Sequence, residues 1–179
     1  ITSILLTICF TAIGQAYSRK KALTFYPGTY IDTEYRHTDS KGIIVIVQNS
    51  IRKGGKYTGP TGQDFFSAIY WYRVINETAI PLELTIKFPA DSFSMPSLPD
   101  SYLKVFLPLD TMTLDKENVY AYGATGLKSF LDNGLTEPTT LQRTINSKDA
   151  CLFYIGVLDY QTSAPARAEL ILKEQGLFY

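Results

Sequence analysis

Hydrophobic and polar residues alternate along much of this chain, and helical periodicity is scarce. The clearest alternation covers residues 82–88, where Leu82, Leu84, Ile86 and Phe88 take one face and polar residues take the other. This pattern predicts a strand of an antiparallel sheet with one face buried.

Two further segments have strong strand character. Residues 43–47 are five consecutive β-branched residues, which predicts a strand covered on both faces. Residues 65–75 are rich in aromatic and β-branched side chains. On that strand Trp71 faces opposite to Tyr70 and Tyr72, so we expect one face in the core and consider an aromatic surface patch on the other. The remaining predicted strands cover residues 29–38, 102–107, 139–145, 150–160, 166–173 and 177–179.

Glycines and short helical signals separate these strands. Residues 39–42 have the turn chemistry of a hairpin, and residues 52–62 contain four glycines, which predicts a loop. Helix is expected only between residues 114 and 131, as one or two short segments. About eight short strands with regular turn signals predict an all-β fold, a single antiparallel β-sandwich with one or two short helices in a connection. The core residues predicted with it are Val74, Leu84, Ile86, Phe153 and Ile155.

The N-terminal residues have the pattern of a signal peptide. An apolar run at residues 4–13 is followed by small residues at alternate positions and a basic cluster at residues 19–21. The run is too short to span a bilayer as a helix. We expect residues 1–18 to be a signal peptide whose charged start lies upstream of this sequence, with cleavage after Ala16 or Ser18. Residues 19–179 then form one exported domain, periplasmic or extracellular, without a transmembrane segment.

Charge and cysteine content narrow the possible partners. The chain has 17 basic and 17 acidic side chains, so it lacks the cationic excess needed to bind nucleic acid or an anionic membrane surface. Cys9 lies in the predicted signal peptide, which leaves Cys151 alone in the mature chain and excludes an intramolecular disulfide. We expect Cys151 to pack as a small hydrophobic residue.

The sequence offers no catalytic or metal-binding constellation. His37 is the one histidine, so a multi-histidine metal site is excluded, and no Gly-x-Ser-x-Gly motif is present. Asp32 and Glu34 would share one face of a strand, with His37 and Asp39 on the other, which is typical of a solvated strand. The sequence therefore predicts no catalytic residue, no metal and no cofactor.

The glycine-rich segment at residues 52–62 carries the one binding hypothesis. Arg52, Lys53 and Lys56 supply donors for a carboxylate or sulfate, and Tyr57 supplies a stacking face. The segment is no phosphate-binding P-loop, because Tyr57 replaces the required serine or threonine.

Asn76 begins an Asn-Glu-Thr sequence that matches an N-glycosylation acceptor. We interpret Asn76 instead as a turn-forming residue, since asparagine side chains bond readily to nearby backbone groups.

The segments YRVINET (residues 72–78), PLELTI (81–86) and INSKDACLFY (145–154) resemble immunoglobulin-like domains of exported bacterial envelope proteins. The resemblance implies an immunoglobulin-like sandwich and no particular activity. We expect a non-enzymatic binding or structural module whose partner is an envelope protein or a glycan. The alternative is a hydrolase acting on a glycan or peptide. It would require His37, or a pair of acids from Asp91, Asp110 and Glu117, to converge.

Overall fold

The computed structural model describes residues 30–38, 44–95, 98–134, 136–160, 170–173 and 176–178. The predicted signal peptide, with Cys9, lies outside these residues, and so does the predicted turn at residues 39–42.

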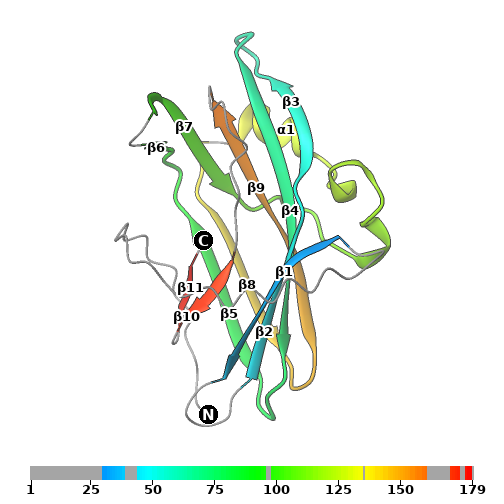
Figure 1. Ribbon diagram of the computed structural model, residues 1–179. Helices are drawn as coiled ribbons and strands as arrows, with labels where there is room; N and C mark the ends of the chain where they lie inside the picture. The colour runs from blue at the N-terminus through cyan, green and yellow to red at the C-terminus, as the bar shows by residue number, and fades with distance from the viewer. Residues whose placement is uncertain are drawn as a thin grey trace.

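The described chain is mostly antiparallel β-structure in two packed sheets, as the sequence predicts (Figure 1). The larger sheet has the strand order β1-β2-β4-β9-β7-β6, with β3 also paired to β4, and β5 pairs with β8. A short hairpin of β10 and β11 lies near the C-terminal end. The strands are β1 (Ile31–Thr38), β2 (Ile44–Ser50), β3 (Lys53–Thr58), β4 (Asp64–Asn76), β5 (Leu82–Phe88), β6 (Phe93–Met95), β7 (Leu98–Phe106), β8 (Thr139–Ile145), β9 (Ala150–Tyr160), β10 (Ile171–Lys173) and β11 (Gly176–Phe178).

The helices fall where the sequence predicts them, in the connection from β7 to β8. Two 3-10 helices, η1 (Leu114–Lys116) and η2 (Tyr120–Gly123), precede the α-helix α1 (Leu127–Asn133). We call residues 107–134 the helical connection. No helix in the described part of the chain is long and apolar enough to cross a membrane.

The prediction of a loop over residues 52–62 is wrong for residues 53–58 and holds for the turn at residues 59–62. Residues Lys53–Thr58 form strand β3, which pairs with the N-terminal half of β4. Because β9 occupies one edge of β4 along most of its length, β2 and β3 follow each other along the opposite edge. Glycines disfavour a strand through backbone entropy, and here the long partner β4 outweighs that preference by offering a hydrogen-bonding edge.

The large sheet has a hydrophobic core on each face. One core joins it to β5 and β8, and it contains all five core residues predicted from the sequence. The other core joins it to the helical connection and contains Trp71, Tyr122 and Tyr154. Trp71 and Tyr72 are 0% exposed and Tyr70 is 3% exposed, so neither face of the strand carries the aromatic surface patch considered from the sequence. Trp71 does face opposite to Tyr70 and Tyr72, as the alternation predicts, and the helical connection covers the face that carries Trp71.

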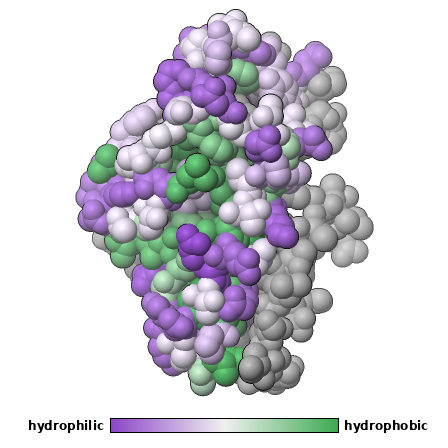
Figure 2. Space-filling view, turned by 180° about the vertical axis from the view of Figure 1, so that it is seen from behind, coloured by the Kyte–Doolittle hydropathy of each residue, from purple (hydrophilic) through white to green (hydrophobic). Residues whose placement is uncertain are grey.

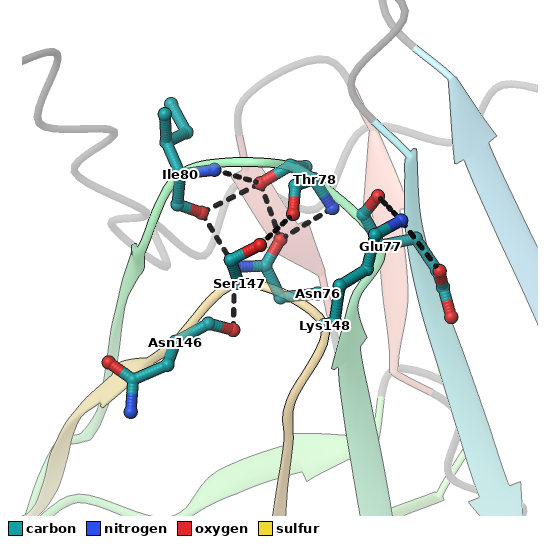
Figure 3. A network of polar contacts seen from close by, with 7 residues as sticks. All are labelled: Asn76, Glu77, Thr78, Ile80, Asn146, Ser147 and Lys148. Atoms are coloured by element: carbon teal, nitrogen blue, oxygen red, sulfur yellow. Dashed lines mark hydrogen bonds and ion pairs between the residues drawn. The ribbon is translucent and has the colours of Figure 1, made fainter.

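The side chain of Asn76 links two turns at one end of the sandwich (Figure 3). Asn76 Nδ2 lies 2.8–3.0 Å from the backbone oxygens of Ile80, Ile145 and Asn146. Asn76 Oδ1 accepts hydrogen bonds from the backbone N–H and the hydroxyl of Thr78. The β4–β5 connection is thereby fastened to the β8–β9 turn, which confirms the interpretation of Asn76 as a turn residue.

The same two turns share further contacts around this amide. Ser147 Oγ donates to Thr78 O, and Lys148 Nζ bonds to both the backbone oxygen and the carboxylate of Glu77 (Figure 3). Asn76 itself is 0% exposed. A glycan attached to Asn76 Nδ2 is therefore incompatible with the folded chain.

Replacing Asn76 by Ala removes all five hydrogen bonds of its amide, including the one to the buried oxygen of Ile145, and takes the acceptor away from the buried N–H of Thr78. We expect Asn76→Ala to lower the free energy of unfolding by about 3 kcal/mol, measured by urea denaturation. Asn146→Ala is the matched control, because the exposed Asn146 contributes its backbone oxygen and should change stability by less than about 0.5 kcal/mol. Equal losses in the two variants would contradict the linking role of the Asn76 amide.

Candidate functional site

The first two residues of the predicted binding segment are engaged in contacts within the protein. Arg52 places its guanidinium 4.6 Å from the centre of the Phe66 ring. Lys53 Nζ donates to the backbone oxygens of Glu117 and Val119. Lys53 thus ties β3 to the helical connection.

Aromatic rings enclose the Lys53 ammonium. Its Nζ lies 4.0 Å from the Tyr30 ring centre and 4.5 Å from the Tyr122 ring centre. Removal from water lowers the pKa of Lys53, and the nearby Glu117 carboxylate partly opposes that shift. These contacts indicate a structural role for Lys53.

The other two predicted residues, Lys56 and Tyr57, lie beside a cleft. Lys56 is exposed and pairs with Asp64 at 2.8 Å. The Tyr57 ring is buried, and its hydroxyl donates to Asp132 Oδ1 at 2.6 Å. Burial and then the hydrogen bond to Asp132 raise the pKa of Tyr57 to about 12, so this hydroxyl stays protonated at neutral pH.

The cleft lies between β3 and the helical connection and has a volume of about 340 Å³. This volume is near the lower end of the range for small-molecule sites, so the cleft suits one small ligand or one unit of a larger one. Strand residues form one side and helical residues form the other. Its lining comprises Gly54, Gly55, Lys56, Tyr57, Thr58, Ser67, Tyr120, Ala121, Leu127, Lys128 and Leu131.

Gly55 lines the cleft and leaves space there because it has no side chain. Gly55 is the register partner of Ser67 on β4, and a Cβ at Gly55 would lie 3.0 Å from Tyr120 Oη. Ser67 shares its face of β4 with Ile69 and Trp71, which pack against the helical connection. The space that a larger residue would fill therefore opens above Ser67.

Ser67 forms the floor of this space and has a hydroxyl without a partner. The residue is 5% exposed, and Ser67 Oγ is buried with no hydrogen bond. Leaving a buried hydroxyl unsatisfied costs about 1–3 kcal/mol. Buried polar atoms without a partner also occur away from the cleft, at Trp71 Nε1 and Gln48 Oε1.

The neighbouring Gly54 is required by the backbone geometry of β3 and β4. Its φ is +142°, and a Cβ there would lie 2.0 Å from the backbone oxygen of Ser67. Gly54 thus permits the close approach of β3 to β4, whereas Gly55 keeps the cleft open.

Asp110 organises the helical connection that forms the far wall. Its carboxylate accepts hydrogen bonds from the backbone N–H and the hydroxyl of Thr125 and from the backbone N–H of Thr111. It also pairs with Lys116 at 3.3 Å. These bonds, led by that from the Thr125 backbone, hold the pKa of Asp110 below its ordinary value.

Two tyrosines fasten η2 to the sheet. Tyr122 donates to the backbone oxygen of Ile51 at 2.7 Å, and Tyr154 donates to the backbone oxygen of Tyr122 at 2.6 Å. Ala121 and Tyr122 have φ values of 46° and 55°, the left-handed region that is uncommon outside glycine. The surrounding contacts hold η2 in this shape, and Ala121 faces the cleft as a result.

The surface seen from the side opposite to Figure 1 has several hydrophobic patches with hydrophilic residues between and around them (Figure 2). Large hydrophobic residues are exposed in the helical connection, and Tyr120, at the cleft, is 73% exposed. The others in this connection are Leu109, Leu114 and Val119.

The candidate groups of the hydrolase alternative lie elsewhere. His37 is on β1, Asp91 follows β5, Asp110 holds Thr125, and none of these three lines the cleft. Glu117 does not line it either, and burial raises the pKa of Glu117 while Lys53 partly lowers it. In the described part of the chain no three His, Cys, Asp or Glu residues are grouped closely enough to hold a metal ion.

Cys151 packs against the core between the sheets, as predicted. It is half-buried, and burial raises the pKa of its thiol.

The segment singled out from the sequence forms one side of the cleft, with Lys56 and Tyr57 among the lining residues, and the residues of the other side were not anticipated. Tyr120, Leu127 and Lys128 lie more than fifty residues further along the chain, and only the folded connection brings them to β3. Ser67 was missed because its place in the lining depends on the strand register that puts it opposite Gly55.

Comparison of the chain with family models, with curated proteins and with solved structures finds no match.

The two adjacent glycines of β3 should respond differently to the same substitution. We expect Gly54→Ala to lower the free energy of unfolding by about 3 kcal/mol or more, because the Cβ clashes with backbone and φ is unfavourable. Gly55→Ala should change it by less than about 0.5 kcal/mol, because the exposed Tyr120 side chain can move. Urea denaturation of both variants checks this, and a large loss in Gly55→Ala would contradict the cleft geometry.

Proposed function

We propose that this chain is a non-catalytic binding module of the bacterial envelope that holds a small ligand in the cleft between β3 and the helical connection. The observation that carries the proposal is the open cleft of about 340 Å³ between β3 and the helical connection, whose lining is mainly apolar. A concave site with apolar walls and few polar groups is the usual form of a small-ligand site.

The ionisable side chains around the cleft favour binding over catalysis. A general base needs a pKa near the working pH. The high pKa of Tyr57 keeps its hydroxyl protonated, and Lys56 and Lys128 are paired with Asp64 and Asp132. A hydrolase would need two of its candidate groups to face one cleft, and this cleft is lined by none of them.

Export and the immunoglobulin-like character are parts of the same proposal. Export is supported by the apolar run at residues 4–13 and the small residues after it. The immunoglobulin-like assignment is supported by two packed antiparallel sheets and by the envelope-domain resemblance of residues 72–86 and 145–154.

The export part is tested by expressing the gene in a bacterial host and sequencing the N-terminus of the product. We expect a chain that begins after Ala16 or Ser18, because these small residues suit signal peptidase. A product that still begins before Thr11 would overturn the proposed export.

The binding part is tested by NMR titration of the ¹⁵N-labelled domain with a panel of envelope saccharides and short peptides. We expect at least one compound to shift the amide signals of residues 54–58 and 120–131. Gly55→Val should remain folded and lose this response, because its side chain fills the cleft. Lys87→Val, on the exposed face of β5, is the matched control and should keep it.

Either of two results would contradict the binding function. One is that no compound shifts the signals of the cleft residues. The other is that Gly55→Val binds as well as the original chain.

A further inference from the structure

Strand β3 lies at an edge of the large sheet, beside the helical connection (Figure 1). Within the described part of the chain it pairs with β4 alone. Residues 54–58 all line the cleft, although successive side chains of a strand point to opposite faces. The cleft therefore runs along the outer edge of β3 and borders its backbone. The other edge strands of this sheet, β1 and β6, contribute no residue to the lining.

The pairing of β3 with β4 determines which backbone groups of β3 face the cleft. Gly59 donates its backbone N–H to the backbone oxygen of Gln63, so the odd-numbered residues of this segment direct their backbone groups toward β4. The backbone N–H and C=O groups of Lys56 and Thr58 then point away from β4, toward the outer edge. Both residues are exposed, and no backbone hydrogen bond joins these groups to another segment of the described chain.

An exposed strand edge that borders a cleft is complementary to an extended peptide. Such a peptide can exchange backbone hydrogen bonds with Lys56 and Thr58 and lengthen the sheet by one short strand. A saccharide has no donors and acceptors at the regular spacing of a strand, so this edge offers it no matching set of bonds. The cleft volume of about 340 Å³ limits the enclosed part of the peptide to a few residues.

The wall opposite β3 is apolar. Leu127 and Leu131 of α1 line it, and both pack with the Tyr57 ring in the core beneath the helical connection. Gly55 leaves room between this wall and β3, because it has no side chain. On an added strand every second side chain would point toward the wall. We therefore expect one apolar side chain of the peptide, such as that of leucine, to contact Leu127 and Leu131.

The mouth of the cleft presents a cation. The Lys128 side chain is 76% exposed, whereas the side chain of its partner Asp132 is 23% exposed. The Asp132 carboxylate also accepts a hydrogen bond from the Tyr57 hydroxyl, so two groups already compensate its charge. Because an exposed ion pair contributes little energy, the Lys128 ammonium can bind a second carboxylate. An acidic peptide therefore complements the charge at the mouth.

We infer that the ligand is an extended peptide that adds a strand to the outer edge of β3. Its apolar side chain contacts Leu127 and Leu131, and an acidic side chain two positions away pairs with Lys128. Residues two apart on a strand share one face, so both side chains point toward the helical connection. This inference rests on the proposed binding function and names the class of ligand for it.

An N-acetylated, C-amidated pentapeptide of sequence Asp-Thr-Leu-Thr-Asp carries these features in either strand direction. NMR titration of the ¹⁵N-labelled domain should show that it binds at residues 54–58 and 120–131. A peptide with both Asp replaced by Asn, and another with Leu replaced by Ser, should each bind about fivefold more weakly or worse. Equal affinity of the three peptides would overturn the inferred recognition.

Backbone pairing is tested with the same pentapeptide carrying N-methyl groups on Leu and on both Thr. These methyl groups keep every side chain and remove backbone donors from both edges of an added strand. We expect the N-methylated peptide to bind about tenfold more weakly or worse. Unchanged affinity would show that the side chains alone are recognised, and strand addition would then be wrong.

Lys56→Pro tests the same pairing from the side of the protein. Proline removes the outward N–H of residue 56 and no bond to β4, and edge strands accept proline where the N–H faces outward. This variant should keep a dispersed NMR spectrum and bind the pentapeptide about fivefold more weakly. Lys56→Ala is the matched control, because it keeps the N–H, and it should bind like the original chain. Unchanged affinity in Lys56→Pro would overturn the inference, and if this variant fails to fold, the N-methylated peptide decides.

Lys128→Ala tests the carboxylate contact. It should weaken the acidic pentapeptide and leave the peptide with two Asn unchanged, whereas Lys56→Ala should leave both unchanged. Equal weakening of both peptides by Lys128→Ala would contradict the assigned contact.

The failure of this inference differs from the failure of the proposed function. If no peptide binds but a saccharide of the panel shifts the cleft signals, the ligand class is wrong and the binding function stands. If nothing shifts them, both are wrong.

Discussion

The buried amide of Asn76 is the constraint on which the arrangement of the two sheets depends. The chain crosses from the large sheet to the smaller one in the β4–β5 connection and crosses back in the β8–β9 turn, and these two of the crossings both bond to this one side chain. The donors and the acceptor of an amide lie in one rigid plane and point in different directions, so one amide can bond to two loops at once. Asn76 is the last residue of β4, the strand that contributes side chains to both hydrophobic cores. Its bonds therefore hold the end of β4 against the loops that lead into and out of the smaller sheet.

Strand β4 connects this clamp to the candidate site. Its even-numbered residues face β5 and β8, and its odd-numbered residues face the helical connection. Toward its other end it pairs with β3, where two successive glycines have different roles. Gly54 allows the backbones to approach, and Gly55 leaves open the space above Ser67. Strand register and one missing side chain therefore both shape the cleft.

Two features near the cleft lower the local stability of the fold, which is typical of functional regions. A buried hydroxyl is left without a partner, and Ala121 and Tyr122 adopt left-handed backbone conformations. The surrounding structure compensates for both. Lys53 binds the backbone of the helical connection, Asp110 holds Thr125, and two tyrosine hydroxyls fasten η2 to the sheet. A rigid wall opposite a glycine-lined strand can keep a small cavity open when no ligand is present.

The sequence by itself determined the β-class, most of the strands and the buried faces of residues such as Leu84 and Ile86, because alternation with period two directly reports which side of a sheet is buried. Two of the residues proposed from the sequence for binding, Lys56 and Tyr57, are among those that line the cleft. The sequence could not determine that residues 53–58 form a strand, since the pairing edge of β4 overrides the preference of glycine only after folding. Nor could it place Ser67, Tyr120 and Lys128 in one cleft. That grouping depends on register and on the path of the helical connection, which are set by long-range packing that no local pattern encodes.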